Sequence, residues 1–263
     1  MGKGPLLASA LLFGLLPASL VPAADPAPSA RIALIIDDLG NNRLTDNRAV
    51  RLPGAVACAI LPHTPHATRI AQEAHRRGKE VLLHLPMQSL TAQEPGPGTL
   101  DSSMFEQELA KMLDYNLASV PHAVGINNHM GSGFMADAPR MAVLMRAIHQ
   151  RGSLFFIDSR THATSVALGA ARTVGVPALS RDVFLDHETN PAAIDRQMQA
   201  LIKLAHRRGY AVGIGHPHPI TLAALERWLP TLDRHGVQLI SLSSLLDTFP
   251  IKEVSPWPVS LSP

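Results

Sequence analysis

The feature that most constrains the fold of this chain is a series of short apolar runs that each end in polar residues. Eight such runs occur, at residues 32–36, 56–61, 81–83, 124–126, 154–157, 183–185, 211–214 and 237–242. Runs of this length that are apolar on both faces are typical of strands in a parallel sheet covered by helices. The pattern predicts either an α/β barrel or an open parallel sheet.

The segments between these runs carry a signal that ends helices. Four of them finish with histidine and arginine followed by glycine, at residues 75–78, 149–152, 206–209 and 234–236. Cationic side chains complement the negative end of a helix, and glycine adopts the left-handed conformation that terminates it. We therefore interpret His75, His149, His206 and His235 as helix-end residues rather than catalytic groups.

Acidic and imidazole side chains stand where the apolar runs end. They are Asp37, Asp38, His84, His129, Asp158, Asp186 and His216. In parallel α/β folds the carboxyl ends of the strands share one edge, where active sites gather. This convergence predicts a metal site with a general base and a general acid. A carboxylate with two imidazoles is a good ligand set for one divalent ion such as Zn²⁺, and we assign Asp38, His84 and His129 to it.

Charge and motif content exclude several classes of protein. The chain has 23 Lys and Arg against 21 Asp and Glu, a net charge of +2, and no basic stripe that could follow a nucleic-acid backbone. It contains no dinucleotide-binding glycine motif, Walker loop, serine-hydrolase elbow or Cys-x-x-Cys pair. We expect no nucleic-acid partner and no nucleotide cofactor.

The amino-terminal residues have the pattern of a secretory signal. Lys3 precedes the apolar residues 6–20, and Val21-Pro22-Ala23 resembles a cleavage site. We expect a signal peptide at residues 1–23, a flexible leader at 24–30 and a periplasmic or secreted mature protein. A retained anchor is the alternative, although no other segment is apolar enough to span a membrane. The remainder divides into a barrel domain at residues 31–249 and an irregular tail at 250–263.

Five motifs follow one another along the chain. They are Ile35-Ile36-Asp37-Asp38-Leu39-Gly40, His84-Leu85-Pro86-Met87, Asn127-Asn128-His129-Met130-Gly131-Ser132, Asp158-Ser159-Arg160-Thr161 and Gly215-His216-Pro217-His218-Pro219. As an ordered set they resemble the divergent polysaccharide deacetylases, over residues 31–247. The resemblance implies a distorted (β/α) barrel of about seven to eight mainly parallel strands. It also implies an exported, zinc-dependent hydrolase that removes N-acetyl groups from a cell-envelope carbohydrate.

The resemblance further implies roles for individual residues. Asp37 is the base that takes a proton from water, and His216 protonates the departing amine. Asp158 orients or tunes one of the imidazoles. His218 is the alternative to His216, which we favour because it directly follows its strand. The expected substrate-binding or secondary positions are Gln88, Asn128, Arg160, Asp186 and His218.

One departure from the ordinary deacetylases leaves a second hypothesis open. Those enzymes have His-Thr/Ser-x-x-His at the third strand, whereas the residue four after His84 is Gln88, a poor zinc ligand. We expect His129 to substitute, with His63, His66 or His218 as alternative ligands. The second hypothesis is a catalytically weak or inactive deacetylase-like protein that acts as a binding or scaffold module in envelope maintenance. Asp37 and His216 favour the enzyme, whereas Gln88 and the small number of aromatic residues favour the scaffold.

Overall fold

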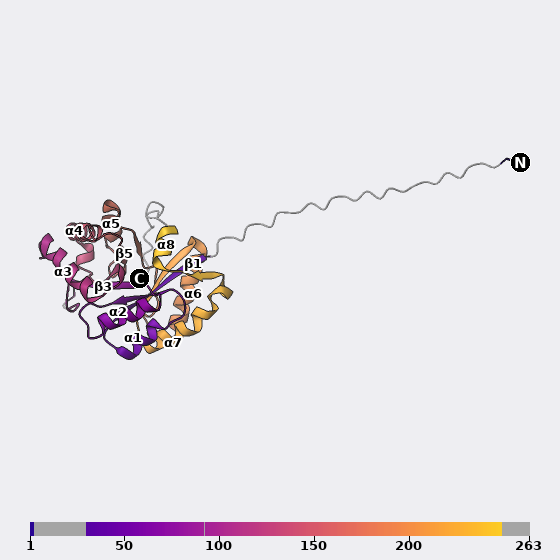
Figure 1. The fold of residues 1–263 in the computed structure, drawn as a ribbon, viewed down its shortest axis with the longest axis horizontal. Coiled ribbons are helices and arrows are strands. Elements are labelled where there is room, and N and C mark those ends of the chain that lie inside the picture. Colours follow the sequence, from indigo (N-terminus) through magenta and orange to yellow (C-terminus); the bar gives the residue numbers. More distant parts are fainter. Residues whose placement is uncertain (3–29, 92, 249–263) are drawn as a thin grey trace.

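The computed structural model describes residues 1–2, 30–91 and 93–248 (Figure 1). The expected signal peptide, leader and carboxyl-terminal tail therefore lie almost wholly outside the described residues. Among the helices in the described part of the chain, none combines the length and apolar character needed to cross a membrane.

A curled parallel sheet forms the centre of the molecule. Its strands are β1 (Ala30–Leu39), β2 (Val56–Ile60), β3 (Val81–Met87), β4 (Ala123–Met130), β5 (Phe155–Asp158), β6 (Ala178–Ser180), β7 (Val183–Phe184), β8 (Tyr210–Gly215) and β9 (Val237–Leu239). Their order is β6-β5-β4-β3-β2-β1-β8-β7, and β9 pairs with the start of β1. Every strand pair is parallel. The fold is a distorted α/β barrel, as the resemblance implied, and its sheet stays open between β6 and β7.

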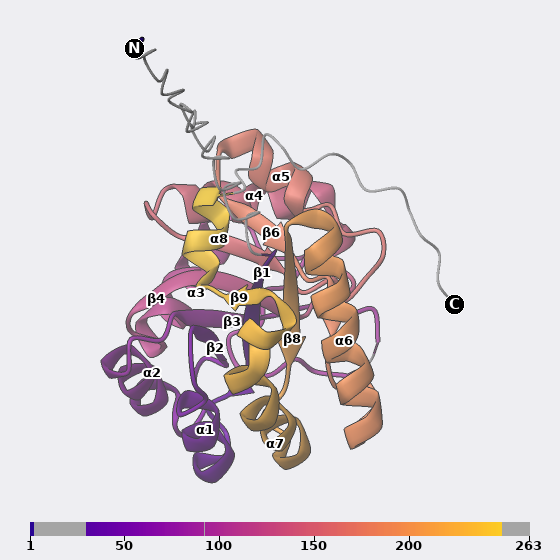
Figure 2. The ribbon, with the colours of Figure 1, turned by 90° about the vertical axis from the view of Figure 1, so that its right-hand side faces the viewer.

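Helices surround this sheet (Figures 1 and 2). They are α1 (Arg43–Val50), α2 (Ala67–Arg76), α3 (Glu106–Ser119), α4 (Ala138–His149), α5 (Ala167–Val174), α6 (Pro191–Arg208), α7 (Pro219–Trp228) and α8 (Leu242–Thr248), with short 3₁₀ helices at Phe134–Ala136 and Leu229–His235. The helix-end prediction is confirmed. Gly209 and Gly236 end their helices in the left-handed conformation, at φ 85° and 67°, directly after basic residues.

The apolar runs supply two separate cores. Leu34 and Ile36 belong to the layer between the sheet and the helices, whereas Ala33 and Ile35 face the inside of the barrel. Successive strand residues point to opposite faces, so a run buried on both faces shows no polar alternation. Helix α8 closes one end of the barrel with Leu242 and Leu245, which pack in the inner core.

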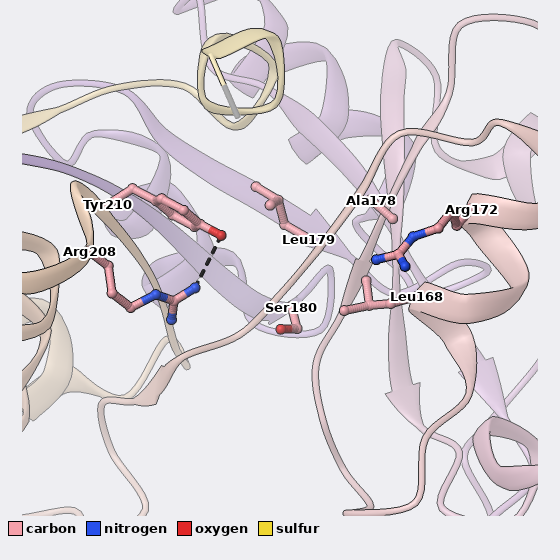
Figure 3. Close-up of a pocket in the computed structure, with 7 residues that line it drawn as sticks. All are labelled: Leu168, Arg172, Ala178, Leu179, Ser180, Arg208 and Tyr210. Carbon is pink, nitrogen blue, oxygen red and sulfur yellow. Dashed lines mark hydrogen bonds between the residues drawn. The ribbon is translucent and has the colours of Figure 1, made fainter. Parts of the chain in front are cut away.

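The open side of the barrel holds a cavity (Figure 3). Its lining residues are Leu168, Arg172, Ala178, Leu179, Ser180, Arg208 and Tyr210. The Arg208 guanidinium donates to Asp182 at 2.6 Å and to the Tyr210 hydroxyl at 3.1 Å, and Asp182 also accepts from the Val212 backbone at 2.8 Å. A hydrogen-bonded ion pair therefore joins the segment between β6 and β7 to the end of α6. None of the predicted site residues lines this cavity.

Two predicted boundaries differ from the structure. Strand β6 is absent from the predicted series, because three residues after Pro177 are too short to give a periodic signal. The run at 237–242 is divided between β9 and the start of α8. The Glu80 carboxylate accepts hydrogen bonds from the backbone of Leu242 and Ser243, at 2.7 and 3.0 Å, which favours a helix start there.

Candidate metal centre

A turn at the end of β1 brings two adjacent carboxylates to one site. Asp38 has a left-handed backbone, with φ of 58°, and the pairing of β1 with β2 shifts register between Ile36 and Leu39. On a regular strand Asp37 and Asp38 would point to opposite faces. The turn is made by the left-handed Asp38 itself and by Gly40, at φ 119°. Non-glycine residues in this conformation are uncommon and cluster at functional sites.

Asp38, His84 and His129 converge from three strands. Asp38 Oδ1 lies 3.1 Å from His84 Nε2 and 3.0 Å from His129 Nδ1. The two imidazole nitrogens are 3.1 Å apart. A tetrahedral zinc site with bonds of about 2.0–2.2 Å spaces its ligands by roughly 3.3–3.6 Å. The triangle therefore has nearly the size of one face of such a site.

The electrostatics of this triangle fit a cation. Asp38 Oδ1 is buried and has no hydrogen bond of acceptable geometry from the described residues. Burial raises the pKa of the Asp38 carboxyl, but the imidazoles of His129 and His84 outweigh burial and hold that pKa below its usual range. Burial lowers the pKa of His84, yet the carboxylates of Asp37 and Asp38 raise it above its usual value. The site thus stabilises positive charge, which a divalent ion also provides.

Asn127 connects a candidate metal ligand, His84, to the predicted base, Asp37. Its side chain is fully buried, and its Oδ1 lies 3.0 Å from His84 Nδ1. Its Nδ2 donates to Asp37 Oδ1 at 2.8 Å and to Ser159 Oγ at 3.2 Å. Because Nδ2 faces these oxygens, Oδ1 is the acceptor for a proton on His84 Nδ1. This tautomer leaves the Nε2 lone pair for a metal ion.

Asp37 is buried beside this triangle at 3% exposure. Burial raises the pKa of its carboxyl above the ordinary value, although His84 and His216 oppose the rise. A carboxylate with a raised pKa accepts a proton more readily than an ordinary aspartate does. Its position and environment therefore suit a general base.

His216 and Asp186 form a pair on the other side of Asp38. His216 Nδ1 lies 3.0 Å from Asp186 Oδ1, and Asp186 Oδ2 accepts from the His216 backbone at 2.7 Å and from Thr221 Oγ1 at 2.8 Å. Burial lowers the pKa of His216, but Asp186, Asp37 and Asp38 raise it to about 9. His216 Nε2 faces Asp38 Oδ2 at 3.8 Å. A protonated His216 can thus donate toward the metal centre.

Asp158 and Arg160 lie on the turn after β5. Asp158 is buried, and its Oδ1 accepts from the Arg160 backbone at 2.7 Å. No contact among the described residues joins Asp158 to His84, His129 or His216. The side chains bonded to these imidazoles are instead Asp186, at His216, and Asn127, at His84. Arg160 is exposed and has a left-handed backbone at φ 50°.

Asn128 and Gln88 hold loops rather than ligands. Asn128 accepts from the Ser159 backbone at 2.8 Å and donates to the Met130 carbonyl at 2.8 Å. Gln88 Oε1 accepts from the Ser102 backbone at 3.0 Å, which fixes the long loop after β3. Both side chains are therefore engaged in shaping the edge of the site.

The alternative histidines have different positions. His63 stacks on Tyr115, with ring centroids 3.9 Å apart, and its Nε2 lies 2.9 Å from Asn116 Oδ1. His66 precedes α2 as its N-cap residue. Neither belongs to a described group of metal-type ligands, whereas His218 groups with Asp186 and His216.

Sequence reasoning missed three polar residues of this region. Asn127, Ser159 and Thr221 are buried and hold the side chains of Asp37, His84 and Asp186. Asn127 and Ser159 stand inside the quoted motifs, so their position after a buried strand was the available signal. Thr221 lies within a helix, where no sequence pattern marked it.

Comparison with known proteins identifies related chains. The model of the divergent polysaccharide deacetylase family matches residues 34–246. The protein YibQ of Escherichia coli strain K12, described as uncharacterised, is 38% identical over 230 residues, which cover 88% of this chain and 72% of YibQ. A solved structure of an uncharacterised protein of Agrobacterium tumefaciens C58 has a TM-score of 0.80 and 28% identity, covering 84% of this chain and 91% of that one.

A more distant structure shares the fold alone. It is described as the T48 deacetylase with substrate, with a TM-score of 0.52 and 13% identity, and the match covers 86% of this chain and 95% of that one.

Proposed function

The chain belongs to the divergent polysaccharide deacetylase family, and from this premise we propose that it is an exported, zinc-dependent hydrolase that removes N-acetyl groups from a cell-envelope carbohydrate. The observation that carries this proposal is the triangle of Asp38, His84 and His129 between a buried carboxylate and a protonated imidazole. This arrangement has a separate group for each role that amide hydrolysis requires.

Each step of the proposed reaction has its own residues at the carboxyl ends of the strands. Asp38, His84 and His129 would hold the ion, which supplies Lewis acidity for an amide carbonyl and for a water molecule when bound. Asp37 takes a proton from the attacking water, while Asn127 holds its Oδ1. His216 gives a proton from Nε2 to the departing amine, and Asp186 holds its Nδ1. The products are acetate and a free amine on the sugar.

Gln88 favours the competing candidate, an inactive scaffold with the same fold. It stands where the ordinary deacetylases, by the resemblance, have their second histidine, and its amide oxygen is bonded to the Ser102 backbone. His129 supports the enzyme, because its Nδ1 approaches both Asp38 and His84.

The decisive experiment combines metal analysis with acetate release. We expect purified protein to carry one tightly bound zinc per chain and to release acetate from N-acetylated glycans. Treatment with a chelator should abolish release, and zinc should restore it. His216→Ala should keep the tight zinc but lose turnover. The control is His149→Ala, which changes an exposed histidine at the end of α4 and should keep both the zinc and the turnover. A zinc-loaded wild type that releases no acetate from any glycan tested would favour the scaffold.

Export is tested separately by the mass of the mature protein. We expect an amino terminus near Ala24 in periplasmic or secreted material. A membrane-bound protein that retains residues 1–23 would replace this proposal with an anchored location.

A further inference from the structure

A second group of metal-type ligands lies beside the first. Asp186, His216 and His218 each offer a ligand atom, and these atoms all lie within 4.8 Å of one another. Asp186 is 4% exposed, His216 is partly buried and His218 is exposed. The group thus extends from the buried edge of the sheet to solvent, which gives an ion a path of entry.

The backbone holds these three ligands in a fixed arrangement. His218 stands between Pro217 and Pro219, whose rings restrict φ, and it is the residue that precedes α7. The rings of His216 and His218 have centroids 5.9 Å apart and are tilted by 36°. Asp186 Oδ2 is bonded to the His216 backbone and to Thr221, so Oδ1 is the oxygen directed at the imidazole.

We propose that Asp186, His216 and His218 form a second, weaker site for a divalent ion of the zinc class, and that an ion bound there inhibits the enzyme. The site itself follows from the ligand geometry. The inhibition rests on the proposed function, because it requires His216 to act as the acid.

The second ion and the catalytic pair compete for the same atoms. Asp186 Oδ1 and His216 Nδ1 are joined by a hydrogen bond of 3.0 Å. A metal ion can bind Nδ1 only after the proton on that nitrogen has passed to solvent, because the lone pair then becomes available to the ion. The ring then keeps one proton on Nε2 but is no longer an imidazolium, so it gives that proton to the leaving amine poorly. Breaking the hydrogen bond also makes this site weaker than the first.

The first centre lowers the affinity of the second. His216 Nε2 lies 3.8 Å from Asp38 Oδ2, so one residue of each ligand group faces the other. Two divalent ions in adjacent sites repel each other. The two sites should therefore fill in sequence, Asp38, His84 and His129 first and the Asp186 group second.

The experiment is a zinc titration of the full mature protein, with bound metal measured at each step by elemental analysis after equilibrium dialysis. The variant is His218→Ala. The control is His149→Ala, which also removes an exposed histidine, at the last residue of α4. The side chain of His218 makes no cap hydrogen bond, so its removal leaves the start of α7 intact.

We expect wild type and His149→Ala to bind two ions. His218→Ala should keep the first ion and bind the second more than about tenfold more weakly, since even an outer partner of a metal site is worth 10–100-fold.

Acetate release is followed in the same titration. It should fall as the second ion binds to wild type, and His218→Ala should resist that fall. Binding of a single ion by wild type, or an unchanged second ion in His218→Ala, would overturn the site. Release that rises with the second ion would overturn the inhibition. A third outcome separates the two proposals. If wild type binds two ions and His218→Ala binds only the first, but wild type releases no acetate at any zinc concentration, the second metal site is confirmed while the proposed function and the inhibition are wrong.

Discussion

At the scale of single residues, the left-handed backbone of Asp38 explains how neighbouring carboxylates can do different work. Asp38 turns its Oδ1 toward His84 and His129, while Asp37 is buried and bonded to Asn127. A strand without this turn would send one carboxylate to the opposite face of the sheet. The proposed division between metal ligand and base therefore depends on the φ angle of Asp38.

The first prediction separates these two aspartates. Asp38→Asn should lose the tight zinc, because an amide is a poor substitute for a carboxylate ligand. Asp37→Asn should keep one tight zinc per chain but lose turnover by roughly 10²–10⁴-fold, as expected for a general base. Metal content and acetate release measured on the same samples check both statements. Equal loss of metal in the two variants would contradict the division of roles.

The second prediction concerns the charge of His216. Hydrogen bonding to Asp186 is the largest of the effects that raise the His216 pKa to about 9. Asp186→Asn removes a negative charge that favours the imidazolium, so the pKa should fall. Turnover needs the protonated ring and should decline as the pH rises through this pKa, at a lower pH in the variant than in wild type. NMR titration of the His216 ring in metal-free protein gives the pKa directly. An unchanged pKa in the variant would be incompatible with the pairing.

At the scale of elements, a side chain from a distant segment caps the start of helix α8. Glu80 precedes β3, yet its carboxylate binds the first backbone amides of α8, more than 160 residues later. A carboxylate at this end complements the helix dipole and satisfies amides that lack partners within the helix. Helix α8 in turn covers the inner core of the barrel.

The third prediction tests this cap. Glu80→Ala should lower the free energy of unfolding by about 0.5–2 kcal/mol, the range for lost helix caps. Glu226→Ala is the matched control, because Glu226 lies outside the first turn of α7 and its carboxylate forms an exposed ion pair with Arg48, and such pairs contribute about 0–1 kcal/mol. Urea denaturation followed by circular dichroism measures both. A loss in Glu80→Ala no larger than in the control would show that α8 does not depend on this contact.

At the scale of the whole molecule, the candidate metal centre joins strands of an incomplete barrel. The sheet ends at β6 and β7, and the Arg208 to Asp182 ion pair joins the segment between these strands to the end of α6. Asp38, His84 and His129 come from β1, β3 and β4 respectively. An ion bound by all three would cross-link strands on both sides of β2, so metal occupancy should affect global stability.

The fourth prediction measures that effect. Free zinc at about 100 times its Kd stabilises the folded state by about 2.7 kcal/mol, which corresponds to a rise in Tm of about 5–10 °C for a domain of this size. Chelation should lower the Tm of wild type by this amount, and thermal denaturation with and without chelator checks it. Asp38→Asn should show little response. A wild-type Tm that does not respond to chelator would argue against a tight ion at this centre.

The sequence by itself determined the features that depend on neighbours along the chain. Apolar runs predicted the parallel strands, since residues buried on both faces lose polar alternation. Basic residues before Gly209 and Gly236 predicted helix ends, because the left-handed conformation is available to glycine at little cost. The rule that parallel strands end at one edge brought Asp37, Asp38, His84, His129 and His216 into one candidate site.

Only the tertiary structure decided which of these groups touch and through which atoms. Asp186 pairs with His216 across 30 residues, and Asn127 binds Asp37 across 90, at distances no local pattern encodes. The left-handed turn at Asp38 and the short strand β6 also depend on neighbours in space rather than in sequence. The orientation of a side chain is set by the packing and hydrogen bonds of segments that meet only in the folded chain. The sequence therefore determined which chemical groups lie at the carboxyl ends of the strands, and the fold decided which of their oxygens and nitrogens face one another there.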